Sequence, residues 1–313
     1  MRQKAAAFGL LWVAGLACSG LAVGDPVPDQ GLIEHEQVRL ILLSTAVTTS
    51  KGRPVRGLEA EDFLLFEDDS ARSIEFFATE EELPISLAFV LDVSGSMEFR
   101  GRLDDSKEII RNFVGNLRPE DRMGLICFAD EQVAWVTEFT NDSERFLRRL
   151  EVQEGLGPTA LYDALAASPH LVDAKTRERK AIVLLTDGLD NASRLTQLEA
   201  VWLARRVQVP IYTINFLRMK EAQLPREARQ NLRLLERFSS ETGGASFAVH
   251  SPKELANAVE RIQAELTFQY VIGYYPPKGD PDGAFRAVRL DTLRKGLHVR
   301  TRRGYYVEPW APR

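Results

Sequence analysis

Cysteine and histidine are scarce in this chain, and each scarcity excludes a class of protein. Its 313 residues contain two cysteines and four histidines. Two cysteines cannot form the disulfide framework of small secreted domains, so the fold must depend on a hydrophobic core, which a 44% hydrophobic composition can supply. The histidines are scattered, without cysteine or carboxylate residues at ligand spacing, and this pattern argues against a zinc site.

The chain also lacks an excess of positive charge. Its formal net charge is −5, from 40 Lys and Arg against 45 Asp and Glu. Removal of the N-terminal segment described next takes away Arg2 and Lys4, which leaves 38 against 45 and a net charge of −7. A chain of this charge is a poor partner for nucleic acid or an anionic membrane surface, so we expect no binding to nucleic acid.

One long apolar run stands at the N-terminus. Residues 1–24 begin with basic residues, continue with an apolar stretch and end with small residues, which is the pattern of a secretory signal peptide. The stretch is too short for a membrane span, and we expect none in the mature chain. Cleavage after Gly24 predicts an exported protein, either periplasmic or extracellular. A lipid anchor on Cys18 is the alternative, although Gly15 stands where the lipoprotein signal usually has leucine.

A second apolar run ends abruptly in a polar loop. Residues 85–91 contain almost no polar side chain, which predicts a strand buried on both faces of a parallel sheet. The loop that follows offers Asp92, Ser94 and Ser96 on alternate residues, and Gly95 permits a tight turn. Carboxylate and hydroxyl oxygens suit a hard divalent cation. A polar loop with a serine helix cap is the alternative.

Two later stretches supply similar groups. Thr159 precedes an expected helix, and the apolar residues 181–186 predict a strand that ends at Asp187. Because ligand loops of such sheets lie at the carboxyl edge of the strands, we expect the three loops to converge there. Together, Asp-x-Ser-x-Ser, then Thr, then Asp resembles the metal-ion-dependent adhesion site of the von Willebrand factor A (VWA) domain.

The resemblance implies a fold, a cofactor and a partner. All five positions of that site are filled here, by Asp92, Ser94, Ser96, Thr159 and Asp187. In the VWA family, the two serines and often the threonine contact the metal, whereas the two aspartates act largely through water. The expected cofactor is a divalent cation, Mg²⁺ foremost, with Ca²⁺ or Mn²⁺ possible because the ligands are hard oxygens. The open coordination position takes an Asp or Glu carboxylate from a protein partner.

The order of predicted elements gives the fold class and the domain boundaries. Strands and helices alternate over residues 84–264, which predicts an α/β domain with a doubly wound, mostly parallel sheet. Residues 25–35 look like a linker. Short strands predict β modules at 36–83 and 265–313, and we expect these two flanks to pair into one small β-sandwich.

The flanks also carry a resemblance, to the Acidobacterial-type VWFA-related family of exported bacterial proteins, which covers nearly all of the chain after the signal peptide. The matching residues are 51–58, 62–63, 66–68, 157–163, 269–277 and 302–306. The family has no settled activity, and the resemblance therefore informs architecture more than role. One departure from the family is Pro158, where relatives often carry glycine.

Two other functions remain open from the sequence. The chain could be a metal-assisted hydrolase, or a scaffold in which the metal is only structural. No base stands near the metal loops, and neither Gly-x-Ser-x-Gly nor His-Glu-x-x-His occurs, so a binding protein without enzymatic activity is favoured.

Several single residues have a structural and a functional interpretation. Asp190 and Asn191 follow the last metal loop and could hydrate the ion, although helix capping is the commoner use. A carbohydrate platform could be formed by Tyr274, Tyr275, Tyr305 and Tyr306, but cross-strand packing is favoured. Ser143 is expected to cap a helix. Cys127 is expected in the core.

Overall fold

The computed structural model describes residues 40–80, 84–130, 132–175, 179–217, 224–277 and 282–307. These residues all belong to one compact unit. The expected signal peptide, the lipid-anchor alternative at Cys18 and the linker at 25–35 lie outside the described residues. Within the described ranges, no helix is long and apolar enough to cross a membrane.

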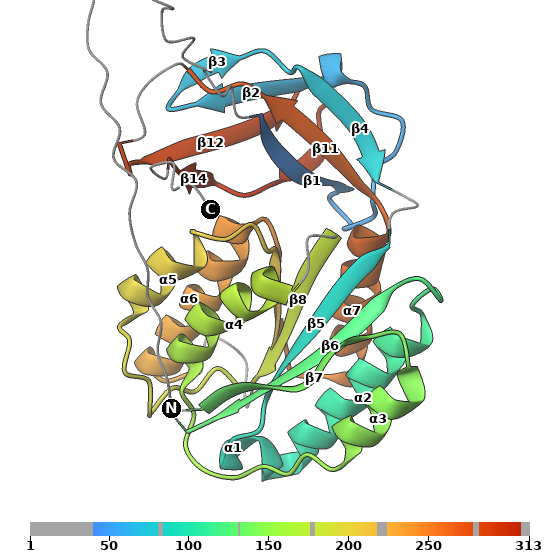
Figure 1. Ribbon diagram of the computed structural model, residues 1–313, viewed down its shortest axis with the longest axis vertical. Coiled ribbons are helices and arrows are strands. Elements are labelled where there is room, and N and C mark those ends of the chain that lie inside the picture. Colours follow the sequence, from blue (N-terminus) through green and yellow to red (C-terminus); the bar gives the residue numbers. More distant parts are fainter. Residues whose placement is uncertain are drawn as a thin grey trace, which may run out of the picture. The chain divides into compact units, whose positions relative to one another are not determined.

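A six-stranded sheet forms the centre of the α/β part (Figure 1). Its strand order is β10-β9-β8-β5-β6-β7, and every neighbouring pair is parallel except β6 and β7. The predicted α/β class with a mostly parallel sheet is therefore confirmed. The strands are β5 (Ile85–Asp92), β6 (Arg122–Ala129), β7 (Gln132–Thr140), β8 (Arg179–Thr186), β9 (Ile211–Phe216) and β10 (Ser246–Val249).

Helices cover both faces of this sheet, as the apolar strands require. One core joins the sheet to α2, α3 and α7, and a second core joins it to α4, α5 and α6. Strand β5 serves both, since Phe89 packs in the first core and Val90 in the second. The helices are α1 (Gly95–Glu98), α2 (Arg102–Gly115), α3 (Ser143–Glu151), α4 (Leu161–Lys175), α5 (Gln197–Ala204), α6 (Arg226–Thr242) and α7 (Pro252–Thr267), with the 3₁₀ helices η1 (Ala60–Asp62) and η2 (Phe99–Gly101).

The two flanks form two four-stranded antiparallel sheets, and each sheet takes strands from both flanks. The orders are β13-β1-β11-β4 and β14-β12-β2-β3. One apolar core contains residues of both sheets, including Leu43 and Tyr270 from the first and Leu65 and Val288 from the second. The strands are β1 (Ile41–Thr49), β2 (Phe63–Glu67), β3 (Ser70–Arg72), β4 (Phe76–Glu80), β11 (Gln269–Tyr274), β12 (Phe285–Thr292), β13 (Leu297–Arg300) and β14 (Gly304–Tyr306).

Two of the tyrosines considered for a carbohydrate platform are buried in this core. The hydroxyls of Tyr274 and Tyr305 donate to the same Oε2 of Glu67, at 2.6 and 2.8 Å. Glu67 is 1% exposed, so these hydrogen bonds satisfy a carboxylate that has left water. The packing interpretation of both tyrosines is therefore correct, because neither ring is available to a ligand.

The α/β part joins the paired flanks through the end of α7. This helix continues to Thr267, three residues beyond the boundary expected at 264, and β11 begins two residues later. An ion pair links Glu265 of α7 to Arg300 of β13. Trp202 of α5 packs edge-on against Tyr306 of β14, with ring centroids 6.2 Å apart. The division into separate domains remains a prediction, and expression of residues 84–267 alone tests it.

Candidate metal centre

Three loops meet at the carboxyl edge of the six-stranded sheet. The first two follow β5 and β8, which are parallel neighbours. The third precedes α4 and is tied to the first by backbone hydrogen bonds, from Gly95 N to Gly157 O at 2.9 Å and from Leu156 N to Val93 O at 2.8 Å. Packing is so close that a Cβ on Gly155 would lie 3.0 Å from the carbonyl oxygen of Ser94.

Asp92 is the last residue of β5, where the first loop begins, and it has no exposed surface. Its Oδ1 accepts a hydrogen bond from the backbone N–H of Ser94 at 2.9 Å. Its Oδ2 accepts one from the Thr186 hydroxyl at 2.7 Å. Burial raises the pKa of the Asp92 carboxyl to about 6, although both hydrogen bonds act in the opposite direction. The carboxylate is held in a fixed orientation, and a nearby cation would offset the cost of its charge.

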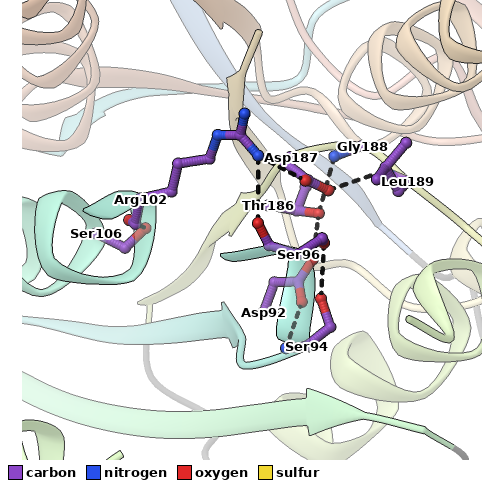
Figure 2. Close-up of polar contacts among 9 residues, drawn as sticks. All are labelled: Asp92, Ser94, Ser96, Arg102, Ser106, Thr186, Asp187, Gly188 and Leu189. Atoms are coloured by element: carbon purple, nitrogen blue, oxygen red, sulfur yellow. Dashed lines mark hydrogen bonds and ion pairs between the residues drawn. The ribbon is translucent and has the colours of Figure 1, made fainter. Parts of the chain in front are cut away.

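The two serines of the first loop point to a common position (Figure 2). The hydroxyl oxygens of Ser94 and Ser96 are 3.1 Å apart, and Ser94 is fully buried. Met97, the residue after Ser96, also has no exposed surface. It packs in the first core and so fixes α1 to the domain. Two hydroxyls held this close beside a carboxylate can both turn their lone pairs to one cation.

Thr159 lies between the other two loops and is 1% exposed. Its backbone N–H donates to Oδ1 of Asn191 at 2.7 Å, and its carbonyl oxygen accepts from the backbone N–H of Asn191 and Ala192 at 3.0 Å. Oδ1 of Asp190 accepts from the N–H of Leu161 at 2.9 Å. Asp190 and Asn191 therefore satisfy the backbone at the start of α4, as the capping interpretation expects.

Asp187 is bound by an arginine that the sequence reasoning missed. Nη1 of Arg102 donates to Oδ2 of Asp187 at 2.9 Å, and the two side chains are 6% and 1% exposed (Figure 2). Oδ1 of the same carboxylate accepts from the N–H of Leu189 at 3.2 Å. The available signal was the position of Arg102, six residues after Ser96, at the start of a helix, where a positive charge is unfavourable.

Asn215 is a second residue that the sequence reasoning missed. It pairs with Thr186 across β9 and β8 and is 1% exposed, yet neither its Oδ1 nor its Nδ2 has a hydrogen-bond partner among the described residues. A Cβ on Gly188 would lie 2.3 Å from Nδ2, so the amide lies against the loop that begins at Asp187. A buried amide without partners is costly, and a water molecule of a hydrated ion would satisfy it.

The donor set suits a hard cation. In the part of the chain that the structure describes, no three His, Cys, Asp or Glu side chains form a cluster that could hold a metal. The five predicted site residues instead carry two carboxylates and three hydroxyls. Side-chain contacts join Ser94 to Ser96, and Arg102 links Asp187 to Ser96, whereas the hydrogen bonds of Thr159 are made by its backbone, on a loop that is itself hydrogen-bonded to the first. Oxygen ligands with few charges and space for water are what Mg²⁺ takes in proteins. The residues present therefore fit a divalent cation.

Comparisons with known proteins agree with this architecture. Residues 87–189, which include all five predicted site residues, match the model of the von Willebrand factor type A domain. An uncharacterized protein of Borreliella burgdorferi is 28% identical over 201 residues, which cover 61% of this chain and 58% of that protein. Bovine inter-alpha-trypsin inhibitor heavy chain H4 is 24% identical over 241 residues, or 71% of this chain and 24% of its own length.

The chain thus spans less than two thirds of either relative. Among solved structures, proximal thread matrix protein 1 from the mussel byssus, with a zinc-occupied MIDAS motif, aligns with a TM-score of 0.48 at 16% identity. That alignment covers 62% of this chain and 49% of the mussel chain. The family match and the observed fold together place a von Willebrand factor type A domain in the α/β part of this chain.

Proposed function

We propose that this chain is an exported protein that binds a divalent cation, Mg²⁺ foremost, and uses it to hold an Asp or Glu side chain of a protein partner. The cation would be held by Asp92, Ser94, Ser96, Thr159 and Asp187. The observation that carries the proposal is the junction of three loops at one edge of the sheet, where the Ser94 and Ser96 hydroxyls lie 3.1 Å apart above the buried Asp92.

The donor set explains why such a centre would bind an anion. Ser94, Ser96 and Thr159 are neutral ligands, and the carboxylates of Asp92 and Asp187 already accept hydrogen bonds from protein groups. A divalent charge held mostly by neutral oxygens is incompletely neutralised, so a carboxylate from outside is an effective final ligand. The cation supplies a point of positive charge, and the chain supplies its position.

The same contacts support binding in preference to catalysis. A general base needs a lone pair directed at a substrate proton. Asp92 is fully buried, with both oxygens occupied by Ser94 and Thr186, and Asp187 is ion-paired with Arg102. Neither carboxylate is placed for proton abstraction, and we propose that the chain binds its partner without chemical change.

A capture experiment tests the proposed function. The purified chain, immobilised, is incubated with a periplasmic or extracellular fraction in Mg²⁺ or in EDTA. We expect Mg²⁺-dependent capture of a protein that is lost in EDTA and in Thr159→Ala but kept in Ser143→Ala, which removes an exposed hydroxyl at the start of α3. Circular dichroism should remain unchanged in EDTA, whereas a purely structural metal would take the fold with it. Equal capture with and without chelator would contradict the proposal.

A further inference from the structure

We propose that Arg102 is a built-in counter-cation of the metal centre, which competes with the divalent cation for Asp187 and makes cation binding and carboxylate binding depend on each other. This inference rests on the proposed function, because it assumes a cation at the three loops. It assigns to Arg102 a regulatory role at the metal centre, because the guanidinium already pairs with a carboxylate that the cation would use.

The first support is the set of contacts that the guanidinium makes. Nη1 donates to Oδ2 of Asp187 at 2.9 Å and to the backbone oxygen of Ser96 at 3.3 Å (Figure 2). The guanidinium carbon also lies 5.7 Å from the ring centroid of Phe99. Arg102 therefore touches two of the five residues predicted to hold the cation, one in each of two loops.

The second support is the position of Arg102 in its own helix. It is the first residue of α2, where the helix dipole makes a positive charge unfavourable by about 0.3–1 kcal/mol. Asp104 and Asp105 follow in the same turn and are the residue types that this position favours. A buried arginine at a helix N-terminus needs a compensating anion, and Asp187 is the one that it contacts.

The third support is the charge balance of the centre. Asp92 and Asp187 alone would present two negative charges to a divalent cation, but with Arg102 the ionised set carries a net charge of −1. The smaller net negative charge weakens the attraction of the centre for the cation. Once the cation is bound, the same set carries a net charge of +1, which favours a carboxylate partner. Because the two binding events are thermodynamically linked, the partner raises the affinity for the cation by the same factor as the cation raises the affinity for the partner.

The fold also provides space for a displaced guanidinium. Arg102 lines a groove of about 1050 Å³ between α2 and α7. Asp105 and Glu108 line the same groove. Burial, together with the neighbouring charges of Glu108 and Asp104, raises the pKa of Asp105, and a positive charge placed near this carboxyl would act in the opposite direction. A guanidinium that leaves Asp187 can therefore turn toward carboxylates without returning fully to water.

Titration calorimetry with Mg²⁺ alone tests the inference. Arg102→Met keeps much of the side-chain volume and removes the charge, and we expect it to bind Mg²⁺ about tenfold more tightly than wild type, the effect of about 1.4 kcal/mol. Arg102→Lys keeps the charge and should bind within about threefold of wild type. Arg111→Gln is the matched control, since Arg111 lies on the same helix, is 43% exposed and pairs with Glu151. Its affinity should equal that of wild type.

A second readout uses the protein without partner. Addition of Mg²⁺ should raise the melting temperature of Arg102→Met more than that of wild type, because the cation replaces the lost counter-charge of Asp187. If Arg102→Met fails to fold by circular dichroism, Arg102→Gln, which keeps an N–H donor for Asp187, takes its place. Equal or weaker Mg²⁺ binding by the folded neutral variant overturns the inference.

The two proposals fail differently. If wild type binds Mg²⁺, Asp92→Ala does not, and Arg102→Met binds like wild type, only the role of Arg102 is wrong. If neither wild type nor Arg102→Met binds Mg²⁺, the metal centre itself is wrong, and the inference fails with it. Detectable binding in Arg102→Met alone supports the inference, because it reveals a centre that Arg102 had held closed.

Discussion

The pKa of Asp92 predicts that protons compete with the cation in a mildly acidic range. Burial raises this pKa from 3.8 to about 6 in the metal-free protein. The raised value means that the folded protein binds a proton more tightly than the unfolded chain does. In the metal-free protein, Asp92 therefore contributes about 3 kcal/mol to the free energy of unfolding while its carboxyl is protonated. This contribution is complete below about pH 4 and is lost as the pH rises through about 6. A divalent cation needs the deprotonated carboxylate, so proton release accompanies its binding.

The size of the effect follows from the fraction of Asp92 that is protonated. With a pKa of about 6, apparent Mg²⁺ affinity falls about twofold at pH 6 and about tenfold at pH 5, relative to pH 7.5. With an ordinary aspartate pKa of about 3.9, the fall at pH 5 would be less than about 1.1-fold. At pH 5 the two pKa values therefore predict Mg²⁺ affinities that differ by about an order of magnitude.

Calorimetric titration of Mg²⁺ at pH 7.5, 6 and 5 measures this dependence directly. Repetition at pH 6 in two buffers of different ionisation enthalpy should show release of about half a proton per cation. Thr186→Val is an informative variant, because it removes a hydrogen bond that lowers the pKa of Asp92. We expect its affinity to begin falling at a higher pH. Affinity at pH 5 within twofold of that at pH 7.5 would refute the reasoning.

Three further predictions concern the centre and the paired sheets. Thr159→Ala should abolish measurable Mg²⁺ binding with little change in far-UV circular dichroism, since the side chain is a proposed ligand; normal affinity would remove Thr159 from the site. Asn215→Leu should stabilise the metal-free protein in urea by about 1–3 kcal/mol, because it removes a buried amide without partners, and should weaken Mg²⁺ binding; destabilisation together with unchanged affinity would show that the amide has no role at the ion. Tyr274→Phe should cost about 1.5–3 kcal/mol in urea unfolding, because it breaks a hydrogen bond to the buried carboxylate of Glu67. Tyr275→Phe, which alters a residue 48% exposed, should change stability by less than about 0.5 kcal/mol, and equal effects of the two variants would contradict the structure of the core.

The sequence was most informative where local pattern and position coincide. The apolar run that becomes β5 is buried along its whole length, and its abrupt end at Asp92 identified the loop that the structure places at the sheet edge. The pattern was less exact for helix ends. Ser143 was expected to cap α3, but Oδ1 of Asp142 accepts the hydrogen bond from Arg145 N, at 2.9 Å. Adjacent Asp and Ser are both good caps, so composition alone does not choose between them.

Residues whose role depends on tertiary contacts could not be predicted. Arg102 stands out locally as a positive charge at a helix start, but Asp187 lies 85 positions away in sequence, so the pattern does not identify the partner of the ion pair. Asn215 continues an apolar strand, and its isolation is visible only when the side chains around it are in place. The predicted β-sandwich implied two sheets with strands from both flanks, but not the strand orders, because registers such as that between β2 and β12 join segments far apart in the chain.

The central claim is tested most directly by a crystal structure of the protein crystallised with Mn²⁺, in which the anomalous signal locates the ion. The account predicts one strong peak at the carboxyl edge of the sheet, about 2 Å from the hydroxyl oxygens of Ser94, Ser96 and Thr159. Water should lie between the ion and the carboxylates of Asp92 and Asp187. A saturated crystal with no peak there, or with the ion held at another place, would contradict the account.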